Sequence, residues 1–237
     1  MKERILAAIL TGLLGWGAHI EPIWAQAQEA QEAQISDPWE GFNQSMFTLN
    51  LKLDEYVLRP VATAYDTVMP NEAQRGVGRF LKNLGVVERF ANNVFQGKLP
   101  GAGQEAGRFL VNTVLGCAGF IEVAEPVFGL KESPEDFGQT LATYGAGNGP
   151  YLVLPFYGPS TVRDAVGLAV DSALNPMNYL LSTTEVIAIK GGLTLANAVN
   201  SRSMNLDLFE NAERSAVDLY GAVQDGYIQR REQAVKE

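Results

Sequence analysis

Residues 37–56 of the chain read DPWEGFNQSMFTLNLKLDEY, and this stretch predicts an amphipathic helix. Asp37 can act as the N-cap, Pro38 suits the first helical position, and Glu40 can complete a capping box. Apolar side chains then recur at steps of three and four residues, which places on one helical face Trp39, Phe42, Met46, Leu49 and Leu53. Such a face is usual in a packed core, and it also suits the acyl region of a membrane or the wall of a pore.

Helical patterns continue through most of the chain. Proline and glycine positions predict helices at about 60–69, 71–84 and 86–97. A largely apolar stretch that begins with the helix Gln104 to Leu115 is expected to be the most buried part of the protein or the part deepest in lipid. Further helices are expected at about 161–174, 184–200 and 207–233. Strand-type alternation is almost absent, so the sequence predicts an all-α fold with one hairpin.

The hairpin is expected where glycine and proline interrupt the helical pattern. Residues 145–160 read GAGNGPYLVLPFYGPS, with a short extended run at 151–154. We expect the aromatic side chains here to be exposed: Tyr144, Tyr151, Phe156 and Tyr157. The turn residues Gly145, Gly147, Gly149 and Pro150 predict either a flexible lip or merely a tight connection.

The ends of the chain suggest four segments. Residues 1–27 resemble a secretory signal peptide, with basic Lys2 and Arg4, an apolar stretch, and Ala25-Gln26-Ala27 as the cleavage site. An uncleaved signal that stays as an anchor is the alternative. Residues 28–36 are a low-complexity linker, residues 37–233 the helical domain, and residues 234–237 a short tail.

Composition excludes several classes of function. The formal net charge is −9, so binding to nucleic acid or to an anionic membrane surface through charge is not expected. His19 is the only histidine and lies in the predicted signal, which argues against a Ser-His-Asp site or a histidine-ligated zinc. Cys117 is the only cysteine and is expected to be a small buried residue. We therefore expect no enzyme activity, no cofactor and no metal site.

Three stretches together resemble the MlaA/VacJ lipoprotein family. They are SDPWEGFNQSMFTLNLKLDEYVLRPVATAY at 36–65, GRFLVNTVLGCAGFIEVA at 107–124 and EDFGQTLATYGAGNGPYLVLPFYGPSTVRD at 135–164. The resemblance implies a ring-like single domain of amphipathic helices in the inner leaflet of the bacterial outer membrane, on its periplasmic side. It implies that misplaced outer-leaflet phospholipid passes through an amphipathic channel to a periplasmic lipid carrier, which feeds an inner-membrane ABC transporter. It also implies association with a porin trimer.

One departure from the family concerns its lipobox cysteine. The corresponding stretch LLGWGA at 13–18 holds Trp16 and no cysteine. Acylation is therefore not expected there, and anchoring is expected to rest on the apolar belt of the ring or on an uncleaved signal.

The residues suit a passive lipid path. Exposing the roughly 30 methylenes of two acyl chains to water would cost about 25 kcal/mol, so the tails should stay in lipid while the headgroup follows a polar wall. We expect the channel to be lined by Trp39, Phe42, Asn43, Met46, Asn50, Tyr144, Tyr151, Phe156 and Tyr157. The two asparagines could solvate a headgroup, or they could instead bond ordinary backbone groups. Arg163 and Asp164 are expected to form a local salt bridge or helix cap.

A second function from a different class stays open. The chain could be a porin-associated scaffold that moves no lipid. A lipid-cleaving enzyme is disfavoured, because a GxSxG elbow is missing along with histidine.

Overall fold

The structure is a computed structural model that describes residues 37–175 and 183–236. Ser36–Glu237 forms one compact unit, and the fold below is that of its described residues. The predicted signal peptide at 1–27 and the predicted linker at 28–36 lie outside them.

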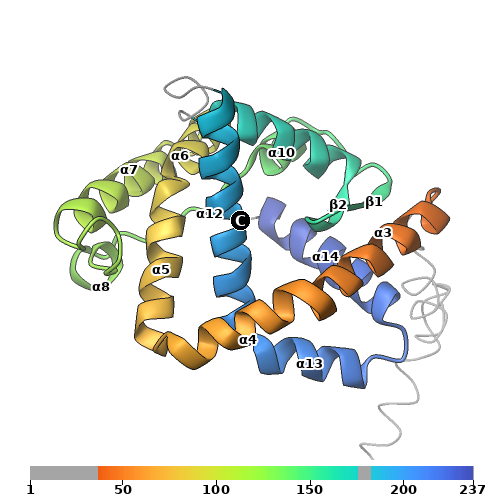
Figure 1. The fold of residues 1–237 in the computed structure, drawn as a ribbon. Helices are drawn as coiled ribbons and strands as arrows, with labels where there is room; N and C mark the ends of the chain where they lie inside the picture. Colours follow the sequence, from red (N-terminus) through yellow and green to blue (C-terminus); the bar gives the residue numbers. More distant parts are fainter. Residues whose placement is uncertain (1–36, 176–182, 237) are drawn as a thin grey trace, which may run out of the picture. The chain divides into compact units, whose positions relative to one another are not determined.

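The predicted all-α fold with one hairpin is confirmed (Figure 1). The first half contains α3 (Glu40–Leu53), the π-helical segment η1 (Asp54–Leu58), α4 (Arg59–Val68), α5 (Asn71–Leu84), α6 (Val86–Phe95), α7 (Leu99–Val114) and α8 (Ala124–Phe128). The second half contains α9 (Phe137–Thr143), β1 (Tyr151–Leu154), β2 (Gly158–Thr161), α10 (Val162–Leu174), α12 (Thr183–Met204), α13 (Leu206–Ser215) and α14 (Leu219–Lys236). The helix predicted at 207–233 is thus two helices.

The break between α13 and α14 has a local cause. α13 ends at Ser215, and its C-cap residue Ala216 has extended backbone with ψ 126°. The side chain of Asp218 then accepts a hydrogen bond from Gly221 N at 3.1 Å and caps the next helix. This capping signal, Asp218 ahead of α14, was missed because helical periodicity alone runs across it.

The predicted capping role of Asp37 is wrong. α3 begins at Glu40, and its N-cap residue Trp39 makes no side-chain cap hydrogen bond. Asp37 Oδ1 accepts a hydrogen bond from Asn43 Nδ2 at 2.6 Å, and Oδ2 accepts one from the Tyr220 hydroxyl. Asp37 therefore ties α3 to α14 instead of closing the first turn.

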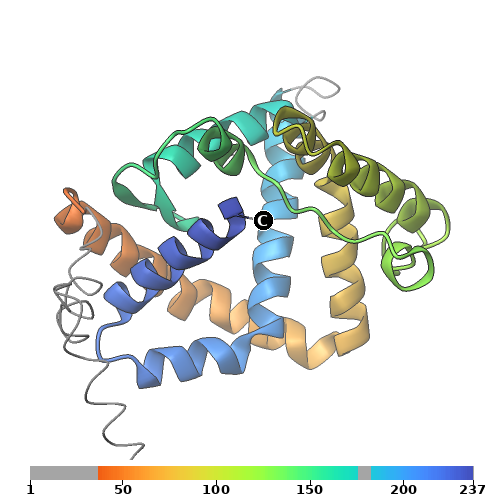
Figure 2. The same cartoon turned by 180° about the vertical axis from the view of Figure 1, so that it is seen from behind.

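Contacts between elements close a circuit within this unit. α3 continues through η1 into α4, α4 contacts α12, and α12 contacts α5. The circuit then passes from α5 to α6, on to α9 and α10, and through the hairpin back to α3. Figures 1 and 2, seen from opposite sides, both show α12 running from α4 toward α6 and α10. Helices therefore border the space inside the circuit from several sides.

The hairpin forms as predicted. β1 and β2 pair antiparallel, from Tyr151 opposite Thr161 to Leu154 opposite Gly158. The expectation that all its aromatic side chains are exposed is wrong for Tyr151, which is fully buried. Its ring lies 6.1 Å from that of Tyr220 and 6.4 Å from that of Tyr227, so α14 covers it.

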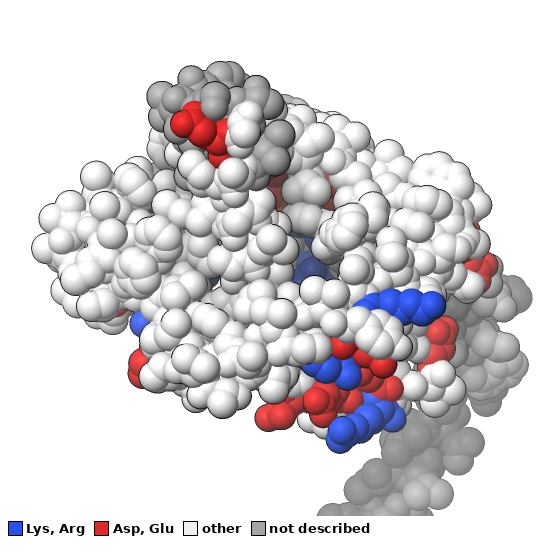
Figure 3. Space-filling view, viewed as in Figure 1, with Lys and Arg blue, Asp and Glu red and all other residues white. Residues whose placement is uncertain are grey.

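The described residues are polar inside and apolar outside. Only six apolar residues are buried, against nineteen polar or charged ones. Large apolar side chains are exposed on several helices, among them Phe42, Leu99, Leu110, Val114 and Val127. On the face drawn in Figure 3 the charged side chains gather mainly at the lower edge, near α13, and most of the remaining surface is uncharged. This is the reverse of an ordinary water-soluble domain.

The stretch expected to be the most buried shows the same reversal. On α7 the side chains of Glu105, Arg108 and Asn112 are buried, while Leu110 and Val114 are exposed. The prediction that the apolar side chains of this stretch are buried is therefore wrong for α7, because this helix turns its polar face inward. Cys117 is also exposed, contrary to prediction, in a turn where its φ is 51°. Among the described helices, none has the length and hydropathy needed to cross a membrane.

Candidate functional site

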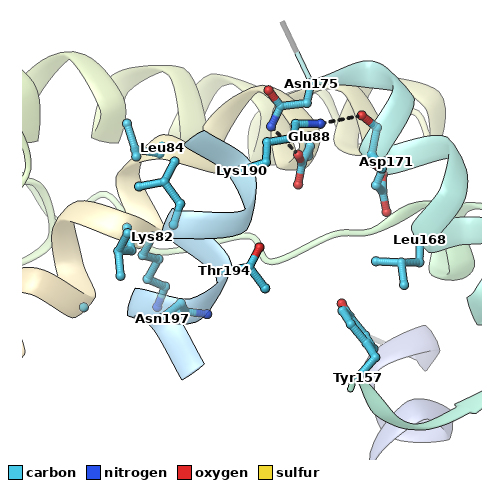
Figure 4. A pocket seen from close by; sticks show the side chains of 15 residues that line it. Lys82, Leu84, Glu88, Tyr157, Leu168, Asp171, Asn175, Lys190, Thr194 and Asn197 are labelled. Atoms are coloured by element: carbon cyan, nitrogen blue, oxygen red, sulfur yellow. Dashed lines mark hydrogen bonds between the residues drawn. The ribbon is translucent and has the colours of Figure 1, made fainter. Parts of the chain in front are cut away.

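A cavity of about 600 Å³ lies between α5, α6, α10 and α12. Tyr157, in the hairpin turn, lies opposite α12 across it (Figure 4). The space-filling view shows a hollow near the centre of one face, with acidic and basic atoms visible inside it (Figure 3). The cavity is the candidate functional site, because helices of the circuit border it on several sides.

The cavity is amphipathic. Its apolar lining consists of leucines from four places on three helices: Leu81, Leu84, Leu168 and Leu193. Its polar lining consists of Lys82, Glu88, Asp171, Ser172, Asn175, Lys190, Thr194 and Asn197. A molecule with an apolar part and a charged part could therefore contact a matching wall with each part.

The charged groups of the cavity are concentrated near the end of α10. Glu88 on α6 accepts a hydrogen bond from Asn175 Nδ2 at 3.1 Å, and Lys190 on α12 donates to the carbonyl oxygen of Ser172 at 3.0 Å (Figure 4). Burial raises the pKa of Glu88 above its ordinary value, although the hydrogen bond from Asn175 acts against the rise. A carboxylate here is thus poorly stabilised by the protein alone.

Asp171 is the second carboxylate of the cavity and is buried. Its oxygens accept hydrogen bonds from Asn92 Nδ2 at 2.7 Å and from Phe137 N at 2.9 Å. Burial still raises its pKa, against the lowering effect of these two donors. The two donors fix the orientation of the carboxylate without supplying a counter-charge.

A tight crossing of two helices positions Asp171. A Cβ atom at Gly167 on α10 would lie 2.4 Å from the backbone nitrogen of Gly138 on α9. Only glycine fits this contact, which brings the start of α9 against α10. α10 itself begins at the cap formed by Thr161, whose hydroxyl accepts from Asp164 N at 3.2 Å.

A second group of charges, partly or fully buried, closes α14 over α9 and α10. Arg231 Nη2 donates to Asp136 Oδ1 and Asp164 Oδ1, both at 2.9 Å, and the Tyr227 hydroxyl donates to Asp164 Oδ2 at 2.7 Å. Burial by itself would raise the pKa of both carboxyls, but the Arg231 guanidinium holds each pKa below its ordinary value. The expected local pair of Arg163 with Asp164 is also present, at 3.0 Å. We call Arg231, Asp136, Asp164 and Tyr227 the arginine clamp.

The two asparagines predicted to line a channel bind the hairpin. Asn43, which is 0% exposed, donates to the carbonyl oxygen of Tyr151 at 3.0 Å and accepts from Val153 N at 2.8 Å. Asn50 in the same way donates to Leu154 O at 2.9 Å and accepts from Phe156 N at 2.7 Å. The amides act as an extra strand edge for β1, so the backbone-bonding alternative describes them and the headgroup alternative does not.

The apolar residues predicted with them lie on the outside of α3. Trp39 and Phe42 line a shallow apolar groove together with Leu152, Val162, Ala165, Val166 and Ala169. Phe42 is 50% exposed, and Met46 is half-buried. The prediction that this helical face packs in the core is therefore wrong, because the apolar face of α3 points outward.

Of the nine predicted channel residues, only Tyr157 borders the cavity. Tyr144 is exposed, and its hydroxyl donates to the carbonyl oxygen of Phe95 at 2.7 Å. Phe156 is exposed at the tip of the turn, where its φ is 66°. Gly145 and Gly149 have positive φ, as a tight connection requires, and Gly147 and Pro150 lie in the same exposed segment.

Sequence reasoning missed the main cavity residues. On α12 the polar residues Lys190, Thr194 and Asn197 recur at four and three residues along a mostly apolar helix. That spacing is the signal that could have identified a polar stripe facing the cavity. No group of three potential metal ligands occurs in residues 37–175 and 183–236.

Comparisons with known proteins agree with this geometry. The family model described as MlaA lipoprotein matches residues 35–234. The intermembrane phospholipid transport system lipoprotein MlaA of Escherichia coli (strain K12) is 37% identical over 201 residues, which is 83% of this chain and 77% of that protein. The protein of the same name from Haemophilus influenzae is 32% identical, over 84% of this chain and 79% of that protein.

A solved structure is also similar. It was described under the heading "Structural basis for maintenance of bacterial outer membrane lipid asymmetry". The TM-score is 0.70 and the identity 34%, and the match covers 84% of this chain and 99% of the other. The likeness therefore extends over nearly all of the described fold.

Proposed function

The chain belongs to the MlaA lipoprotein family, and from this membership we propose that it is a component of an intermembrane phospholipid transport system. In this role it maintains outer-membrane lipid asymmetry by removing misplaced phospholipids from the outer leaflet. The single observation that carries the proposal is the amphipathic cavity enclosed by helices whose outer faces are apolar.

The energetics favour such an arrangement. Exposing two acyl chains to water would cost about 25 kcal/mol, and moving a phosphate through hydrocarbon would cost several kcal/mol or more. The leucine wall of the cavity suits the acyl chains, and the polar wall with Lys190 suits the phosphate. Such a path lowers both costs without a chemical step, so we propose transport and not catalysis.

The family resemblance and the apolar exterior together suggest where the protein acts and with which partners. We propose that the apolar exterior seats the protein in the inner leaflet of the outer membrane, beside a porin trimer. Phospholipid then leaves the cavity on the periplasmic side to a soluble carrier that feeds an inner-membrane ABC transporter. The exposed apolar side chains of α3 and α7 support the membrane location.

Blocking the cavity tests transport. Thr194→Trp should fill the space between α12 and Tyr157, whereas Leu195→Trp, one residue along the same helix on an exposed position, should not. In a strain that lacks the gene, only the Leu195 variant should restore a low level of surface-exposed phospholipid. Equal restoration by both variants would refute transport through this cavity.

The porin-bound scaffold is the competing proposal. A transporter purified from membranes should retain phospholipid, and Thr194→Trp should reduce the amount retained. A scaffold should retain none specifically, and its porin association should be the only property lost on deletion. The apolar and polar walls of the cavity favour transport, because a scaffold has no need of either.

A further inference from the structure

The buried carboxylates of this protein differ in whether the chain supplies them with a cation. In the arginine clamp, Arg231 contacts both Asp136 and Asp164. In the cavity, Glu88 is bonded by an amide and Asp171 by an amide and a backbone nitrogen. The cavity carboxylates are therefore oriented and desolvated, and no guanidinium of the described residues contacts them. The charges of Arg89 and Arg231 act on Glu88 and Asp171, respectively, only from a longer distance.

The lysines of the cavity supply only part of the missing charge. Lys82 forms an ion pair with Glu132 at 2.5 Å and is about half-exposed. Lys190 donates to the carbonyl oxygen of Ser172 and acts on Glu88 only through its longer-range field. With Lys82 paired outside the set, the wall has two carboxylates, Glu88 and Asp171, against one ammonium, that of Lys190.

We propose that the cavity selects phospholipids whose headgroup carries an ammonium, with Glu88 as the contact and Asp171 adding to the attraction, over headgroups that carry only negative charge. This inference rests on the proposed function. The headgroup ammonium would contact the carboxylate of Glu88 directly, which Lys190 does not, and Lys190 on the facing helix would attract the phosphate. A headgroup that carries only negative charge would still be attracted by Lys190, but it would lack the contact with Glu88.

The directions of the pKa shifts agree with this reading of the geometry. The pKa values of Glu88 and Asp171 are raised chiefly by burial. Repulsion from Asp171 adds to the rise at Glu88, and repulsion from Asp136 adds to the rise at Asp171. Those of Asp136 and Asp164 are lowered, although they too are desolvated. An incoming cation would therefore gain more at the cavity pair than at the clamp.

The test measures which lipid the full-length protein takes up. The protein is incubated with vesicles of equal parts phosphatidylethanolamine and phosphatidylglycerol, recovered, and its bound lipids are quantified by mass spectrometry. We expect phosphatidylethanolamine to be enriched by about three- to tenfold, the scale of one charge-assisted hydrogen bond. Glu88→Gln, which keeps the side-chain shape and the acceptor for Asn175, should bring the ratio close to one.

A matched control separates the cavity from general surface charge. Glu72→Gln removes an exposed carboxylate that pairs with Arg75 on α5, and it should leave the enrichment unchanged. Melting curves of both variants show whether each is folded. Equal uptake of the two lipids by the wild type, or an enrichment that survives in folded Glu88→Gln, would overturn the inference while leaving transport intact. If the wild type took up neither lipid, the proposed function itself would fail.

Discussion

The arginine clamp and the cavity place the same kind of group, a carboxylate that is at least partly buried, in opposite situations. In the clamp, Arg231 lies between Asp136 and Asp164 and lowers the pKa of both carboxyls. In the cavity, Glu88 and Asp171 are held by neutral donors and burial raises the pKa of both. The clamp is satisfied within the chain, and the cavity is not.

The difference separates structure from function in this molecule. A buried charge pair that is complete joins elements: here α14 to α9 and α10. A buried charge that is incomplete costs stability, and it persists where a ligand can supply the missing partner. The two regions should therefore respond in opposite ways to neutralisation of one group.

Arg231→Met should have the largest effect on stability. It leaves Asp136 without its guanidinium and Asp164 with Arg163 as its remaining cation, which costs about 3 kcal/mol at neutral pH. Denaturant unfolding of the purified protein measures the loss. Arg230→Met removes the exposed neighbour, whose guanidinium lies 5.9 Å from the centre of the Tyr227 ring, and should cost less than about 0.5 kcal/mol. Equal losses in the two variants would contradict the role of the clamp.

Asn43→Ala should have the next largest effect. It removes the bridge between α3 and β1 and leaves the buried groups Val153 N and Tyr151 O without this partner. The expected loss is about 2 kcal/mol by the same unfolding measurement. Gln44→Ala removes an exposed amide bonded only to Glu40 among the described residues, and it serves as the control. A loss no larger than that of the control would show that the hairpin does not depend on the asparagine.

Glu88→Gln should have the smallest effect, and it should be stabilising. Because the folded pKa of Glu88 is raised, the folded protein binds more protons than the unfolded chain from pH 4.5 up to that raised value. Wild-type stability should therefore fall as pH rises through this window, and the variant should lack that part of the fall. The clamp has the opposite sign: its contribution should be lost as pH falls below 3.8, the ordinary aspartate value. Unfolding curves between pH 3 and 8 measure both, and a steeper fall in the variant would contradict the assignment.

Most of the fold could be predicted from the sequence because its helices are local. Proline and glycine positions gave the approximate ends of α4, α5 and α6, and the glycine-rich segment gave the hairpin. The break at Asp218 was missed, since a helix cap is a single side chain within a continuing apolar pattern. Asp37 was misassigned because a partner 183 residues away takes up its side chain.

The candidate site was much less predictable. Periodicity identifies the apolar face of a helix but not whether that face points inward or outward. On α3 the apolar face points outward and Asn43 points inward, so Trp39 and Phe42, which were predicted to line the channel, border the outer groove and not the cavity. The residues that border the cavity come from α5, α6, α10 and α12, which are far apart in the sequence.

The sequence by itself determined the all-helical class, the single hairpin and the family resemblance, because these depend on local spacing and short motifs. Only the tertiary structure decided that polar side chains fill the interior, that Arg231 compensates one pair of carboxylates, and that Glu88 and Asp171 face a cavity with little compensation. The physical reason is that solvation and charge pairing depend on which helices pack against one another. The periodicity of a single helix does not reveal its packing partners.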